Sequence, residues 1–220
     1  MAGAADVDIP PICHLHFGDV TAEYVRRKEF YYSWRVRGDS VHMQISDYMM
    51  GCPDDVLSDL CDMICRRAKG LKWSESGRFL DYVTSDGYIL RNRPTYIARS
   101  RNLIRSDSGD HYNLSYSVQR LLDSGILSDS DISNSYISWT RRDSRRRVGF
   151  CSTMFRLVGI SAALDSPDVS EHALDYVVYH ECLHLRQGYR PSHRVHDSVF
   201  RKWENSYPGW EDAEAELRKL

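Results

Sequence analysis

The chain has 220 residues, of which 42% are hydrophobic, and its formal net charge of −2 with a pI near 6.5 is close to neutral. This composition can fill the core of one large domain over residues 1–220, and it excludes a global electrostatic attraction to nucleic acid or to an anionic membrane. The sequence shows neither a basic region followed by an apolar core nor a stretch approaching about 18 continuous apolar residues. We therefore expect a soluble cytoplasmic protein with no membrane contact.

The first third of the chain predicts a leader, a hairpin and a helix. Residues 1–22 carry two prolines and little periodicity, so a loose leader is expected. The aromatic and β-branched runs 29–36 and 41–47 flank a short Gly-Asp turn, as in a β-hairpin. Residues 53–69 predict an amphipathic helix with proline in its first turn, basic residues at its end and Gly70 as the cap.

The middle of the chain is less regular. Residues 72–133 alternate short apolar clusters with polar residues, and only 113–123 shows a clear helical stripe, so we expect a mostly helical insertion. Three apolar or alternating runs, 135–142, 147–151 and 154–161, then predict a β-meander. The segment Arg141–Arg147 holds five arginines against one aspartate. It could contact phosphates, although a solvated turn is favoured because no aromatic residues interleave with the arginines.

The pattern with the clearest chemistry is His180-Glu181-Cys182-Leu183-His184, which reads H-E-x-x-H. It lies in the run Glu171–Gly188, which has no proline and no glycine before its end, so a helix is expected. Residues four apart share one helix face, so the imidazoles of His180 and His184 can bind one metal ion, with zinc the expected occupant. Glu181 lies beside them, where its carboxylate can act as a general base toward water.

A catalytic zinc ion usually has three protein ligands, and the third must come from elsewhere. Three candidates follow the helix: His193 and His196 in or near the next loop, and Glu204, which lies 20 residues after His184, close to the spacing in thermolysin-type enzymes. Spacing alone leaves all three open.

A family resemblance bears on this choice. The run 176–185, followed by a loop, His196, Phe200 and the segment 208–210, resembles the SprT-like and YgjP-like zinc metallopeptidases. Their pattern is H-E-x-x-H, a variable loop, a third histidine with a phenylalanine four residues on, and a later Pro-x-Trp or similar. The long region 72–133 has no place in that pattern.

The resemblance implies a zincin-like α+β fold. We expect one small antiparallel or mixed sheet, built from the 29–47 hairpin and the 135–161 strands, to pack on the 53–69 helix and the metal-binding helix. It implies His180, His184 and His196 as ligands, Glu181 as the general base, and a peptide or protein as the substrate. The strand 154–161 would then receive the substrate by edge pairing. Two alternatives remain: a protease acting on DNA-bound proteins through Arg141–Arg147, and a non-catalytic domain in which zinc is structural, with His193 as an extra ligand.

Overall fold

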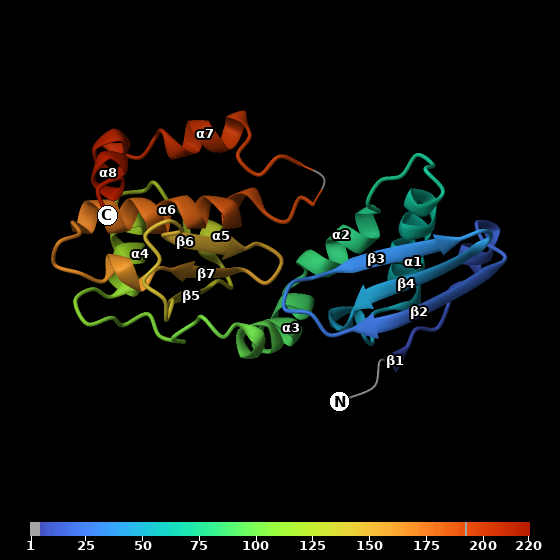
Figure 1. Ribbon diagram of the computed structural model, residues 1–220. Coiled ribbons are helices and arrows are strands. Elements are labelled where there is room, and N and C mark those ends of the chain that lie inside the picture. Colours follow the sequence, from blue (N-terminus) through green and yellow to red (C-terminus); the bar gives the residue numbers. More distant parts are fainter. Residues whose placement is uncertain (1–4, 192) are drawn as a thin grey trace. The chain divides into compact units, whose positions relative to one another are not determined.

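The computed structural model describes residues 5–191 and 193–220 as an α+β protein with two small mixed sheets (Figure 1). By their contacts the residues divide into two compact units, with the boundary between Tyr88 and Ile89. We call these the N-terminal unit and the C-terminal unit. The expected single sheet, built from the early hairpin together with the 135–161 strands, is therefore wrong, because each set of strands forms a sheet inside its own unit.

The N-terminal unit is a four-stranded sheet packed on a helix, with strand order β1-β2-β4-β3. Its elements are β1 (Ala5–Asp6), η1 (Pro11–Leu15), β2 (Asp19–Val25), β3 (Tyr32–Arg37), β4 (Ser40–Ser46), η2 (Asp47–Met49), α1 (Asp54–Ala68) and α2 (Gly77–Thr84). The predicted hairpin is confirmed as β3 and β4, and Gly38 supplies the left-handed conformation (φ 59°) that its turn needs. The predicted helix over 53–69 is confirmed as α1.

The prediction of a loose leader is wrong for residues 5–22. Strand β2 pairs in parallel with β4, and Val20 and Ala22 alternate into the core. Cys13 and Phe17 are also buried. The segment is ordered because its apolar side chains are covered by α1 and the sheet, and those contacts come from later parts of the chain. Residues 1–4, where the leader was also expected, lie outside the described residues.

Helix α3 (Asp86–Arg99) spans the boundary between the units. The other helices of the C-terminal unit are α4 (Leu114–Asp123), α5 (Asp129–Ile132), η3 (Ala162–Leu164), α6 (Glu171–Gln187), α7 (Ser198–Glu204) and α8 (Trp210–Leu217). The mostly helical character of 72–133 is confirmed, and the stripe at 113–123 is α4. The region is not an insertion into one unit, however, because the boundary falls inside it.

The sheet of the C-terminal unit contains β5 (Tyr136–Trp139), β6 (Gly149–Ser152) and β7 (Leu157–Ile160) in the order β5-β7-β6. The predicted strands are present, but the predicted meander is wrong. β7 is central, parallel to β5 and antiparallel to β6, so β6 is an edge strand. All four residues of β7 are buried, as expected of a central strand. The apolar runs in the sequence identify three strands but do not show which of them is central.

Helix α6 lies between the sheet and the later helices of the C-terminal unit (Figure 1). It contacts β6 and β7 of the sheet and also α4, α5, α7 and α8. Its side chains join one apolar cluster with those of the sheet and the later helices, including Trp139, Val158, Val178 and Phe200. Within the described residues, no helix combines the length and apolar composition needed to cross a membrane.

Candidate metal centre

Helix α6 begins and ends where its sequence sets the boundaries. The hydroxyl of Ser170 accepts a hydrogen bond from the Ala173 amide at 3.1 Å, which caps the first turn. Gly188 ends the helix with a φ of 75°, a left-handed conformation that glycine adopts without strain. Twelve of its residues are buried, among them Glu181 and His184. Polar side chains buried to this extent require partners inside the unit.

Three histidines meet beside this helix. His180 and His184, one turn apart, place their ring centroids 5.1 Å from each other. His196 comes from the segment before α7, and its ring centroid lies 5.3 Å from that of His180 and 5.0 Å from that of His184. α7 begins at Ser198, two residues after His196.

The position of His196 is set by its neighbours in sequence. The carboxylate of Asp197 accepts hydrogen bonds from the amides of Val199 and Phe200 and so caps α7. Phe200 is fully buried, and its ring stacks on His184 with centroids 4.6 Å apart. The same ring lies 4.7 Å from His196. The phenylalanine therefore packs against the histidines and limits how their rings can turn.

The nitrogen positions fit a small metal ion. One ligand nitrogen from each of His180, His184 and His196 lies within 4.8 Å of the others, the only such group of three among the described His, Cys, Asp and Glu residues. The Nε2 atoms of His184 and His196 are 3.3 Å apart. Nitrogens about 2.0–2.1 Å from a tetrahedral zinc ion are separated by about 3.3–3.4 Å. This pair therefore has the spacing that a shared zinc ion requires.

The protonation state of His184 also suits a metal ligand. Burial, together with the nearby His180 and His196, lowers the pKa of His184 to about 3. The pKa of His196 is lowered as well, by burial and by His180. A metal binds the neutral imidazole through its lone pair, so both rings have the required form at neutral pH.

Glu204 occupies a different place from the one its sequence spacing suggested. Its Oε1 lies 2.7 Å from Nδ1 of His180, which leaves Nε2 of that ring for a metal. Burial acts to lower the pKa of His180, but the hydrogen bond to Glu204 and the charges of Glu181, Glu204 and Glu214 together raise it overall. A carboxylate on the far nitrogen of a ligating histidine is a common arrangement that fixes the ring. His193, the remaining candidate, is exposed in the loop and is not part of the group of three.

Glu181 is almost completely buried, with 6% of its surface exposed. Burial raises its pKa to about 7, although His180 and Arg147 act in the opposite direction. The carboxylate lies against Gly149 of β6, where a Cβ atom would be only 2.5 Å from Oε1. Gly149 was not singled out from the sequence, although a glycine inside a strand often marks a close approach. An acid with this pKa can exchange a proton at neutral pH.

A cleft of about 780 Å³ opens beside these groups. Its walls include His180, Glu181, Gly149 and the segment Arg145–Arg147. The strand expected to receive an extended substrate, 154–161, contains β7, whose two edges are already paired. That expectation is wrong, and the strand with an edge available beside α6 is β6.

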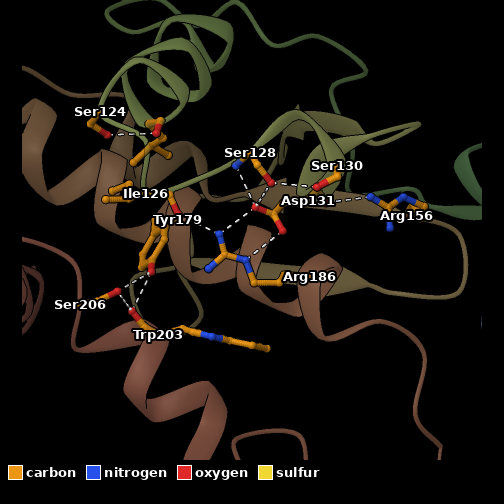
Figure 2. A network of polar contacts seen from close by, with 11 residues as sticks. Ser124, Ile126, Ser128, Ser130, Asp131, Arg156, Tyr179, Arg186, Trp203 and Ser206 are labelled. Atoms are coloured by element: carbon orange, nitrogen blue, oxygen red, sulfur yellow. Dashed lines mark hydrogen bonds and ion pairs between the residues drawn. The ribbon is translucent and has the colours of Figure 1, made fainter.

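The C-terminal end of α6 is tied to the rest of the unit by a polar network (Figure 2). Arg186 donates two hydrogen bonds to the carboxylate of Asp131, at 2.9 and 2.7 Å. Burial opposes ionisation of Asp131, but the hydrogen bonds from Arg186 and Ser128 lower its pKa to about 2. Tyr179 donates to the backbone oxygen of Trp203 at 2.7 Å, linking α6 to α7. The helix that carries two of the histidines is thereby held to α5 and α7.

Comparison with models of protein families, with curated proteins and with solved structures finds no match to this chain.

Proposed function

We propose that the protein is a zinc-dependent metallopeptidase of zincin-like architecture, with His180, His184 and His196 as ligands and Glu181 as the general base. The observation that carries this proposal is the group of three clustered histidine nitrogens, of which His180 lines the same cleft as the buried Glu181. The resemblance of the H-E-x-x-H pattern, His196 and Phe200 to the SprT-like and YgjP-like enzymes supports it.

Each residue of the site would have a separate role in the reaction. A bound zinc ion would supply a Lewis acid, which can polarise the scissile carbonyl and lower the pKa of a bound water to about 7. Glu181 would take the proton of the attacking water on its carboxylate and deliver it to the departing amine. Glu204 would hold the ring of His180, and the outer edge of β6 would align the peptide backbone by strand pairing.

The group of three histidines favours catalysis over a structural zinc site. A structural site is closed by four protein ligands, whereas a catalytic site keeps one position for water or substrate. Among the described residues the group contains three donors, and neither His193 nor Glu204 belongs to it.

Replacing Glu181 tests the proposal. Glu181→Gln keeps the size of the side chain but removes the base, so zinc content and fold should persist while cleavage of unfolded casein falls about a hundredfold or more. Metal analysis and circular dichroism provide the controls. Equal cleavage by wild type and variant would indicate a contaminating protease, and zinc-loaded wild type that is inert across a broad peptide library would overturn the proposed activity.

A further inference from the structure

Three consecutive arginines line the cleft that contains the candidate catalytic group. Arg145, Arg146 and Arg147, which we call the arginine wall, lie one residue before the start of β6 and are exposed. The cleft they line also holds His180 and Glu181. A ligand lying along β6 toward its N-terminal end therefore meets these guanidinium groups next.

The positive charge of the arginine wall is only partly matched: Arg147 is near enough to Glu181 to act on the pKa of that carboxyl group. Arg145 donates to an oxygen of Leu220, the last residue of the sequence, at 2.8 Å, and the guanidinium carbon of Arg147 lies 5.5 Å from the ring centroid of Phe150. No Asp or Glu side chain among the described residues forms a salt bridge with any of the three arginines. A cleft wall of one charge sign attracts ligands of the opposite sign.

The acidic residues of the same cleft already have partners. Glu204 is bonded to His180, and Glu214 is paired with Arg218 and accepts a hydrogen bond from Tyr176. Of the three arginines that line the cleft, Arg146 is exposed and has no recorded carboxylate partner among the described residues. Guanidinium groups bind carboxylates in a bidentate geometry that suits Asp and Glu side chains.

We propose that the arginine wall selects peptide substrates carrying Asp or Glu residues on the side of the scissile bond that runs along Arg145–Arg147. This inference rests on the proposed peptidase function. A peptide paired with the edge of β6 would place side chains beyond Gly149 next to these arginines. A nucleic acid, whose phosphates would meet the same arginines, is the competing ligand in the test below.

The test uses internally quenched peptides of one cleavable core. One set carries three Glu residues and a matched set carries three Lys residues. In each set the charged residues are placed either on the N-terminal or on the C-terminal side of the scissile bond. We expect zinc-loaded wild type to cleave a Glu peptide with kcat/KM about tenfold above its Lys counterpart, for one of the two placements. The preference should shrink as salt is raised from 50 to 500 mM.

Charge reversal identifies the residues responsible. The double variant Arg145→Glu with Arg146→Glu should invert the preference, and Arg146→Glu alone, which removes no recorded contact, should reduce it. The matched control is Arg101→Glu with Arg142→Glu, which makes the same change in net charge at exposed residues outside the cleft. This control should keep the wild-type preference, because neither residue lines the cleft.

A binding measurement separates failure of this inference from failure of the proposed function. Fluorescence anisotropy of labelled Glu and Lys peptides is recorded with the Glu181→Gln protein, with single-stranded DNA of equal charge as a competitor. Equal cleavage of Glu and Lys peptides by wild type would overturn the selectivity and leave the peptidase standing. No cleavage, with Arg146-dependent binding of the Glu peptide, would overturn the peptidase and leave acidic-peptide binding. If DNA bound more tightly than the Glu peptide, and its binding depended on Arg146, the inference would be overturned in favour of nucleic acid.

Discussion

Each histidine of the candidate site is oriented by a different neighbour. Glu204 holds the far nitrogen of His180, Phe200 stacks on His184, and His196 directly precedes Asp197, the residue that caps α7. Each of these contacts restricts the rotation of its ring. Such preorganisation favours metal affinity because less ring freedom is lost on binding.

The first prediction concerns which side chains bind zinc. His180→Ala, His184→Ala and His196→Ala should each abolish retention of zinc during dialysis against a chelator, whereas His193→Ala should retain it. Glu204→Gln should weaken zinc affinity about 10–100-fold, because the His180 ring loses its carboxylate partner. Metal analysis and chelator competition provide the measurement. If Glu204→Gln lost zinc as completely as His196→Ala, the carboxylate would be a ligand instead.

The second prediction concerns the pH dependence of stability in the metal-free protein. The pKa of Glu181 rises from its ordinary value near 4.5 to about 7 in the fold, so the folded state binds more protons than the unfolded state between these values. Its contribution is fully present below pH 4.5 and is lost as pH rises through 7. Removing the charge with Glu181→Gln should therefore increase the free energy of unfolding at pH 8, by on the order of 3 kcal/mol.

Urea denaturation of chelator-treated protein at pH 8 and pH 4.5 measures this effect. The difference between wild type and Glu181→Gln should nearly vanish at pH 4.5, where the carboxyl group is protonated in the folded state. An equal difference at both pH values would mean that packing of the amide, and not the buried charge, causes the stabilisation.

At the scale of elements, the site depends on how closely β6 approaches α6. Gly149 allows the strand to lie against the Glu181 side chain, and β6 is both the edge of its sheet and one wall of the cleft. The third prediction is that Gly149→Ala keeps zinc but lowers peptidase activity about 10–100-fold. The added Cβ, only 2.5 Å from Oε1, would displace the carboxylate from its position.

The matched control for this substitution is Gly87→Ala, where a Cβ meets no heavy atom within 4 Å. It should leave both activity and zinc content unchanged. Unaltered activity in Gly149→Ala would show that the carboxylate can move without consequence and would contradict the role given to its position.

The sequence could predict elements wherever local pattern determines them. The periodicity and caps of α1, α4 and α6 lie within each segment, so these helices could be located without the fold. Strand pairing depends on residues far apart, and for this reason neither the central position of β7 nor the parallel pairing of β2 with β4 could be derived from local pattern. The alternation of Val20 and Ala22 was the available signal for β2.

For the candidate site, the helical spacing of four residues predicted that His180 and His184 share one face, and a family resemblance selected His196. The position of Glu204 could not be predicted in the same way, because it depends on the path of the chain between α6 and α7. Spacing alone is compatible with Glu204 as a ligand or as a partner of His180. Only the distance of 2.7 Å to Nδ1 assigns the carboxylate to the far side of the ring.

At the scale of the whole molecule, the site and its supporting core belong to one unit. All three histidines, Glu181, Glu204 and the arginine wall lie in the C-terminal unit, and the apolar cluster around α6 is built from residues 112–220. The N-terminal unit has a sheet and a buried core of its own. The two units therefore have separate hydrophobic cores. A ligand of the site should directly stabilise only the C-terminal unit.

The fourth prediction follows from this division. A fragment of residues 86–220, which keeps α3 whole, should unfold cooperatively and bind one zinc ion per chain, because it retains the core around α6 and the three histidines. Zinc at about a thousandfold above its Kd should raise the free energy of unfolding by about 4 kcal/mol. Urea titrations followed by circular dichroism, with and without zinc, measure this in the fragment and in the full chain. A fragment of residues 1–85 is the control, and its unfolding should not respond to zinc, since it contains none of the three histidines. Failure of the 86–220 fragment to bind zinc that the full chain retains would mean that the N-terminal unit is needed to form the site.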